Sequence, residues 1–445
     1  MDYLSERFLS SNDIMTLFEK KDIDADWSFE GFKPSQTGKW THDYHRYPAK
    51  FIPQLVEKLI DEYIETKEAH INDPFVGSGT TIVTAISEGF EASGTDINKI
   101  AILMTKVKAT PINPEYLSNK ISHIISRLSF LETGIDSSVQ GTLEPLIPAQ
   151  HVDRIDYWFR PENKLELGMI FRVIDEEFDQ AIKDFFLVAF SHILKNCSIW
   201  LQTSTKPTRD FKKKPAKPFT AFKRQLSKMQ KGNEALYKVT PVKVIEDIDS
   251  FLNIKISDAR RQPVHDESVD LIVSSSPYVT SYEYADLHQL STIWLDFAED
   301  LNQYKQEFIG TSFKAYEDKK LKSEIAQKIV HQMNNKSKKM SKEIEAFFID
   351  MQQVFDESYR ILKKGGRCCY VIGDTRLKGV DILNAEVFAE SIQYSGFVLD
   401  RIIKREIPSK ILPQKRDEKT GRFASNKDAN TEAYPCEYIV IGLKP

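Results

Sequence analysis

The stretch Asn72–Thr81, with the sequence NDPFVGSGTT, constrains the fold of this chain more than any other. It follows the short apolar approach Ala69–Ile71 and precedes Ile82–Glu88, which has the spacing of an amphipathic helix. This pattern predicts a strand, a tight turn and a helix start. Gly77 and Gly79 let backbone N–H groups approach a ligand, which then meets the positive end of the helix dipole. The glycine pair alone is equally typical of an ordinary strand–helix turn, and it lacks the further residues of a dinucleotide fingerprint or a P-loop.

Strands and helices alternate along the rest of the chain, which predicts an α/β fold. Asp96 follows the second expected strand, about 20 residues past the glycine turn, where it can accept hydrogen bonds from ribose hydroxyls or cap a helix. We expect further strands over residues 91–94, 254–256, 268–273, 367–372, 397–403 and 438–443, and helices over 55–63, 344–362 and 386–394, the second of them closed by Gly365 and Gly366.

Residues 111–250 interrupt the α/β pattern. They divide the chain into an N-terminal arm over residues 1–42, an α/β domain over 43–110 and 251–445, and a largely helical insertion. Apolar residues recur with helical spacing from Val152 to Ser198.

A basic segment, Lys206–Lys231, closes the insertion and contains a single acidic residue, Asp210. Charge runs are often only solvated surface. Here prolines and the rings of Phe211, Phe219 and Phe222 favour an extended segment that lies on nucleic-acid phosphates, with rings available for bases. The expected contacts, which the resemblance described next assigns to DNA, are Lys206, Arg209, Lys212, Lys213, Lys214, Lys217, Lys223 and Arg224.

Two segments resemble motifs of one enzyme family. The string Asp73–Thr81 resembles motif I of the amino-methyltransferases, which methylate exocyclic amines of nucleic-acid bases with S-adenosylmethionine. His45–Pro53 contains Pro-Ala-Lys-Phe-x-Pro and resembles motif X of the same enzymes. The resemblance implies a Rossmann-like class I methyltransferase sheet with a cofactor pocket lined by Lys50, Phe51, Asp73, Pro74, Phe75, Gly77, Ser78, Gly79, Thr80, Asp96 and Asp258. In that pocket Asp73 would pair with the cofactor's ammonium, Asp96 with its ribose and Asp258 with its adenine amine.

A third resemblance lies at the end of the expected strand 268–273. Ser275-Ser276-Pro277-Tyr278 is similar to motif IV, which usually reads Asp-Pro-Pro-Tyr or Ser-Pro-Pro-Tyr, with Ser276 replacing the first proline. The resemblance implies that the Ser276 carbonyl and the Ser275 hydroxyl accept hydrogen bonds from the target amine. Tyr278 would stack on a base flipped out of the duplex. The following His288 is interpreted as a helix-surface histidine, with substrate contact as the alternative.

Composition narrows the class of protein further. No run of 18 apolar residues and no signal peptide are present, so we expect a cytoplasmic protein without a membrane partner. The four cysteines lack Cys-x-x-Cys spacing, which argues against a zinc site, and we expect no metal. Because the net charge is −4, DNA binding has to rest on local patches.

These features predict a DNA methyltransferase of the N4-cytosine/N6-adenine family, acting on double-stranded DNA alongside a cognate restriction endonuclease. A serine at the first motif IV position, Ser275, favours cytosine N4 as the target. The alternatives are an adenine-N6 methyltransferase, an RNA guanine-N2 methyltransferase that shares motif I, and a DNA-binding relative inactivated by Ser276.

Overall fold

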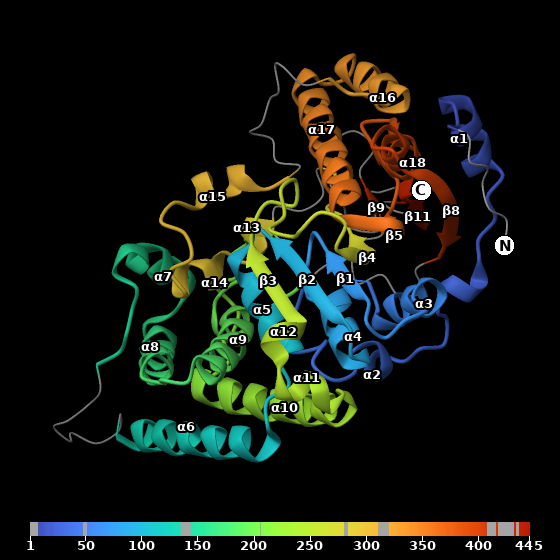
Figure 1. The fold of residues 1–445 in the computed structure, drawn as a ribbon. Coiled ribbons are helices and arrows are strands. Elements are labelled where there is room, and N and C mark those ends of the chain that lie inside the picture. Colours follow the sequence, from blue (N-terminus) through green and yellow to red (C-terminus); the bar gives the residue numbers. More distant parts are fainter. Residues whose placement is uncertain are drawn as a thin grey trace.

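The protein is built around one mixed β-sheet (Figure 1). The computed structural model describes residues 8–47, 51–134, 144–204, 206–279, 284–309, 320–406, 415–416, 431–432 and 436–445. The strand order is β3-β2-β1-β4-β5-β11-β8. The first five strands in this order run parallel to one another, and β11 is antiparallel to both β5 and β8. These strands are β1 His70–Asp73, β2 Glu91–Asp96, β3 Leu252–Ile256, β4 Val269–Ser275, β5 Leu362–Ile372, β8 Val398–Arg405 and β11 Glu437–Leu443.

Helices cover both faces of the sheet because alternate strand residues point to opposite sides. Cys369 and Val371 of β5 pack with α3 and α4 on one face, whereas Cys368 and Tyr370 pack with α16, α17 and α18 on the other. This arrangement confirms the predicted Rossmann-like α/β fold. The helices are α3 Pro53–Tyr63, α4 Thr80–Glu88, α16 Glu324–Asn334, α17 Lys338–Ile361 and α18 Asn384–Tyr394.

The segment between β2 and β3 forms a helical layer beside the sheet. Helices α6, α7, α8, α9 and α10 share a hydrophobic core with α5, whose Ile100, Leu103, Met104 and Val107 belong to it. The chain then returns to β3, an edge strand that pairs only with β2. The helices are α5 Lys99–Ala109, α6 Pro114–Gly134, η2 Ala149–His151, α7 Val152–Trp158, α8 Pro161–Asp175, α9 Gln180–Cys197, α10 Pro218–Val239, α11 Val242–Glu246 and α12 Ile248–Phe251.

The remaining elements surround this frame. In the N-terminal region, α1 packs on α18, and the Ser11 hydroxyl donates to Glu390 at 2.6 Å. None of the described helices has the length and apolarity needed to cross a membrane. The elements are α1 Ser11–Glu19, η1 Ala25–Trp27, α2 Pro34–Thr37, α13 Tyr284–Leu287, α14 Gln289–Trp294, α15 Leu301–Glu307, β6 Thr375–Leu377, β7 Val380–Ile382, β9 Lys415–Arg416 and β10 Thr431–Glu432.

One predicted helix end is wrong. The helix expected to close at Gly365 and Gly366 ends at Ile361, and both glycines lie within β5. Gly365 has φ +80°, and its N–H donates to the carbonyl of Lys444 at 2.8 Å. The glycines therefore shape the start of a strand beside the C-terminus rather than a helix cap.

Candidate active site

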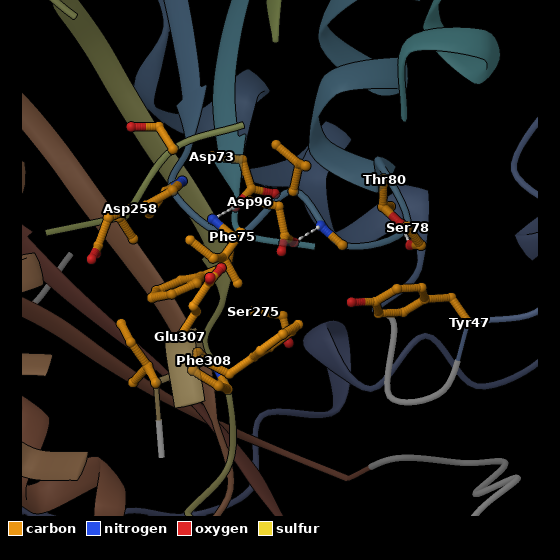
Figure 2. A pocket seen from close by; sticks show the side chains of 18 of the residues that line it. Tyr47, Asp73, Phe75, Ser78, Thr80, Asp96, Asp258, Ser275, Glu307 and Phe308 are labelled. Carbon is orange, nitrogen blue, oxygen red and sulfur yellow. Dashed lines mark hydrogen bonds between the residues drawn. The ribbon is translucent and has the colours of Figure 1, made fainter. Parts of the chain in front are cut away.

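A pocket with about 840 Å³ of empty space lies at the carboxyl ends of β1, β2 and β4. Strand order reverses between β1 and β4, and open α/β sheets bind ligands at such a switch point. The pocket brings together residues from all three motifs that the sequence singled out (Figure 2). Predicted residues that line it are Phe51, Asp73, Pro74, Phe75, Gly77, Ser78, Thr80, Asp96, Asp258, Ser275 and Pro277.

The two glycines of the turn after β1 face different neighbours. Gly77 has φ +45° and lines the pocket; a Cβ there would lie 3.1 Å from the Tyr47 ring, which also lines it. Gly79 has φ +79° and starts α4, but a Cβ there would meet Thr105 of α5, 2.9 Å from its Oγ1 and 3.1 Å from its Cα. Gly79 is not among the residues that line the pocket, and its lack of a side chain allows α4 to pack on α5, so its predicted contact with the cofactor stays a prediction.

The turn is also held from behind by a buried lysine. Lys108 of α5 has no exposed surface, and its Nζ donates to the carbonyl of Ser78 at 2.9 Å. The Ser78 and Thr80 hydroxyls lie 3.0 Å apart, and Thr80 donates to the Phe51 carbonyl at 3.5 Å. These bonds tie the turn to α5 and to the segment before α3. Lys50 lies outside the described residues.

Two carboxylates stand beside the turn. Asp73 is buried and accepts hydrogen bonds from the Ser274 hydroxyl at 2.6 Å and the Phe75 N–H at 3.0 Å. Asp96 accepts from the Gly77 N–H at 3.0 Å. Burial raises the pKa of Asp73 to about 7 and that of Asp96 to about 6. Both carboxylates therefore gain from a ligand that brings a positive charge or hydrogen-bond donors.

The third acidic residue, Asp258, is fixed by an arginine that the sequence did not single out. Arg260 donates its Nε to Asp258 Oδ1 at 2.9 Å and its Nη2 to Oδ2 at 2.5 Å. The other side of the guanidinium forms an ion pair with Asp350 of α17, which is fully buried. In Figure 2, Asp258 and Tyr47 lie at opposite ends of the labelled residues, with Asp96 between them.

The motif IV residues divide between the pocket and the interior. Ser275 is the last residue of β4 and lines the pocket with Pro277. Ser276 is only 1% exposed, and its hydroxyl has no hydrogen-bond partner among the described residues. Tyr278 does not line the pocket; its hydroxyl donates to Glu437 of β11 at 3.0 Å. Only Ser275 thus contributes a motif IV hydroxyl to the pocket.

Some lining residues were missed by the sequence analysis. Tyr47 lies within the segment His45–Pro53 compared with motif X, directly before Pro48, so its position was a usable signal. Glu307, Phe308 and Ile309 come from the end of α15, where no motif marks them. Ser274 does not line the pocket but joins β4 to Asp73, a contact between strands distant in sequence. The other unpredicted lining residues are Val76, Ile97, Ser257 and Ala259.

His288 is buried and does not lie on a helix surface, which corrects that interpretation. Its Nδ1 lies 3.0 Å from Asn98 Nδ2, and its ring centroid is 5.2 Å from that of Tyr47. The amide donates, so this nitrogen accepts. Burial lowers the pKa of His288 to about 3, which keeps the ring neutral. His288 therefore supports Tyr47 from behind the pocket.

The basic segment is only partly extended, which corrects another expectation. Pro218–Val239 forms α10, and Phe219 and Phe222 are buried in the core of the insertion, so neither ring is available for bases. Lys213 donates its Nζ to the carbonyls of Lys195 and Trp200, each at 2.7 Å, and burial lowers its pKa to about 8.

Lys223 also has a partner within the protein: its Nζ forms an ion pair with Glu132 at 2.9 Å. Lys213 and Lys223 are thus structural rather than free for phosphates. The exposed members of the predicted set are Lys206, Lys212, Lys214, Lys217 and Arg224.

The described residues contain no group of three or more His, Cys, Asp or Glu side chains that could hold a metal ion. The residues that line the pocket supply carboxylates, hydroxyls, backbone groups and aromatic rings.

Comparison with known proteins agrees with the motifs. The family model described as DNA methylase, for N6- and N4-methyltransferases, matches residues 6–106. The type II methyltransferase M.MvaI of Kocuria varians is 26% identical, over 100% of this chain and 99% of its own length. M.BsoBI of Geobacillus stearothermophilus is 21% identical over 82% of this chain and 81% of its own.

Likeness to solved structures is lower. A geranyl diphosphate methyltransferase in complex with SAM aligns with 88% of this chain and 86% of its own, at 8% identity and a TM-score of 0.32. The family match, the relatives aligned along the chain and the three motifs gathered at one pocket support assignment of the chain to the DNA amino-methyltransferases, a family that uses S-adenosylmethionine.

Proposed function

We propose that the protein methylates the exocyclic N4 amine of a cytosine flipped out of double-stranded DNA, as the modification enzyme of a restriction–modification system. The observation that carries this proposal is that one pocket gathers Asp73, Asp96 and Asp258 with Tyr47 and Ser275. The type II relatives support the restriction–modification setting. A cognate endonuclease acting on the same site would be the partner.

The three acidic groups could each bind one part of S-adenosylmethionine. Asp258, held by Arg260, would accept from the adenine amine, and Asp96 from the ribose hydroxyls. Asp73, which accepts hydrogen bonds from Ser274 and Phe75, would pair with the ammonium. When bound, the cofactor supplies an electrophilic methyl group on its sulfonium.

The residues of motif IV would prepare the amine as a nucleophile. The lone pair of an exocyclic amine is delocalised into the ring, so acceptors must draw its N–H groups out of that plane. The Ser275 hydroxyl and the Ser276 carbonyl would be these acceptors, preorganised at the end of β4. The bond from Tyr278 to Glu437 would fix the ring that stacks on the base.

The choice of cytosine rests on Ser275. A hydroxyl can both accept from the amine and donate to the neighbouring N3 acceptor of cytosine, whereas a carboxylate at this position could only accept. Mass spectrometry of nucleosides from DNA treated with the protein and S-adenosylmethionine tests this, and N4-methylcytosine is expected. N6-methyladenine as the sole product would move the target to adenine. Methylated guanine in RNA alone, or cofactor binding without any methylated base, would favour the other two alternatives.

The proposed division of the chain is an arm over residues 1–42, a catalytic domain over 43–110 and 251–445, and a target-recognition insertion over 111–250. The insertion contacts the catalytic side through α14, which follows motif IV in the chain. A contact of this kind would carry DNA recognition to the flipped base.

Cofactor affinity is expected to rise with pH between about pH 5 and pH 7. The pKa values of Asp73, about 7, and Asp96, about 6, are raised by burial, so both groups are largely protonated at the lower end of this range. The ionised forms bind the ammonium and the hydroxyls better, so each group can add up to about tenfold in affinity per pH unit while it titrates. Isothermal titration calorimetry with S-adenosylmethionine measures this, and Asp73→Asn should flatten the rise. A dissociation constant independent of pH would contradict these roles.

Replacing Lys212, Lys214 and Lys217 together with glutamine should weaken DNA binding on every sequence alike. These lysines are exposed, and phosphate contacts carry no sequence information. Fluorescence anisotropy at several salt concentrations should show a plot of log affinity against log salt that is flatter by about 0.9 per lost contact. Lys213→Gln is the matched comparison: because Lys213 bonds backbone carbonyls, its loss should lower thermal stability. An unchanged salt slope in the triple variant would show that the lysines are merely solvated.

A further inference from the structure

Arg209 lies between two aromatic side chains on the surface of the insertion. The centre of its guanidinium is 4.0 Å from the ring centroid of Tyr157 and 4.4 Å from that of Phe211. Phe211 is 69% exposed and Tyr157 is 44% exposed, so both rings are accessible from solvent. We call this group the Tyr157–Arg209–Phe211 sandwich. Rings packed around a guanidinium restrict its orientation.

The guanidinium of Arg209 is not committed to any other group that the structure describes. It makes no hydrogen bond or ion pair with a described residue, and its Nε is buried without an acceptor. Other arginines of the chain are paired: Arg260 with Asp258 and Asp350, and Arg401 with Glu62. Because the Nε is buried, the two terminal Nη groups are the donors of Arg209 that remain for a ligand.

The backbone under the sandwich is well supported. Trp200 and Arg209 form an antiparallel β-bridge, flanked by hydrogen bonds from Leu201 N to Thr208 O at 2.8 Å and from Asp210 N to Ile199 O at 2.7 Å. Arg160 donates to the carbonyl of Phe211 at 3.4 Å. The donors of Arg209 are thus preorganised before any ligand arrives.

The sandwich is joined to the part of the chain that follows motif IV. Tyr157 lies on α7, whose neighbouring Trp158 donates its indole N–H to Gln289 of α14 at 3.3 Å. Arg154 of the same helix donates to the same oxygen at 3.3 Å. In Figure 1, α7 lies beside α14 and below α15, the helix whose end lines the pocket. A group bound by the sandwich therefore has a short structural route to the catalytic side.

We propose that the Tyr157–Arg209–Phe211 sandwich reads a guanine in the DNA target site. A guanidinium held in one plane matches the O6 and N7 acceptors of guanine in the major groove with two parallel hydrogen bonds. A phosphate contact needs only a positive charge, which the exposed lysines Lys206 and Lys212 supply nearby. The inference rests on the proposed function, because it identifies how the insertion selects the DNA that is methylated.

The test compares the sequences that each variant methylates. Genomic DNA lacking the modification is treated with S-adenosylmethionine and wild-type protein, Arg209→Lys, Phe211→Ala or Arg127→Lys, and the methylated positions are mapped by single-molecule sequencing. Arg209→Lys keeps the charge but loses the planar fork, so discrimination at one G·C base pair should fall by about tenfold to a hundredfold. Phe211→Ala should lower discrimination at the same base pair, because the guanidinium loses one of the rings that orient it. Arg127 of α6, which is ion-paired with Glu176, is the control. Its replacement should leave the methylated DNA sequence unchanged.

Each result has a distinct meaning. Thermal unfolding and cofactor titration show that the variants are folded, and the exposure of Phe211 makes Phe211→Ala safe in this respect. Lower discrimination at one and the same base pair in Arg209→Lys and Phe211→Ala supports the reading of a guanine by Arg209. An unchanged site, or an equal loss on all sequences, would overturn it while leaving the proposed function intact. If the wild-type protein methylates no DNA, the proposed function itself fails, and the inference with it.

Discussion

Gly77→Val is expected to weaken S-adenosylmethionine binding by on the order of 100-fold, equivalent to about 3 kcal/mol. Two costs add up at this position. A β-branched residue at φ +45° is strained, by about 1–3 kcal/mol. In addition, the new Cβ would lie 3.1 Å from the Tyr47 ring, which lines the pocket and packs 5.2 Å from the His288 ring, so the pocket wall would have to shift. Isothermal titration calorimetry measures the affinity directly.

Two other glycines separate these costs. Gly365→Val places the same side chain at φ +80° with no atom within 4 Å of its Cβ, so it should report backbone strain alone and leave affinity unchanged. Gly79→Val would press on the Cα of Thr105 in α5 and should lower the melting temperature before it affects the pocket. Wild-type affinity in Gly77→Val would refute the assignment of this turn to the cofactor.

Ser275→Ala should lower turnover by about 100-fold while cofactor affinity stays at its wild-type level. The hydroxyl lies at the pocket end of β4 and would hydrogen-bond the amine as the transition state forms. Loss of one such preorganised bond typically costs 10²–10³ in rate. Single-turnover methylation with radiolabelled S-adenosylmethionine measures the chemical step apart from product release.

Ser276→Ala is the matched comparison. The two serines are adjacent, but the hydroxyl of Ser276 is buried without a partner among the described residues, and alanine keeps the backbone carbonyl. Turnover should remain within about twofold, and stability should hold or rise by about 1 kcal/mol, because an unsatisfied polar group is removed. Equal losses in both serine variants would contradict the roles assigned here, since they would point to a general disturbance of the strand end.

Sequence reasoning recovered the parts of this molecule that depend on local chemistry. The apolar strands, the glycine turn and the helix start are set by residues near one another in the chain, so their pattern predicted them. The same holds for the positions of Asp73 and Asp96, which are the last residues of β1 and β2. The strand 438–443 was expected, but its antiparallel place between β5 and β8 was not predicted, because no periodicity along the chain indicates it.

What was missed depends on contacts between distant segments. No local pattern shows that Ser274 reaches Asp73, or that Arg260 joins Asp258 to Asp350. Charge alone also cannot show whether a lysine faces solvent or, like Lys213, bonds carbonyl oxygens inside the protein.

The basic segment did carry a signal that was overlooked. Phe219, Phe222, Leu226 and Met229 are spaced as on one face of a helix, and all four are buried in α10. Pro218 misled the prediction towards an extended chain, although proline is common at the first position of a helix, where it lies here.

The double role of α5 limits how this enzyme could be re-engineered. One side of the helix supplies Ile100, Leu103, Met104 and Val107 to the core of the insertion, while Lys108 holds the turn that lines the pocket. A chimaera cut at residues 110 and 251 would leave these apolar side chains facing a foreign surface. Their exposure would destabilise α5, and with it the hydrogen bond by which Lys108 holds the Ser78 carbonyl of the turn. A transplanted specificity segment must therefore be matched to the face of α5, and not only to the two ends at which it is spliced.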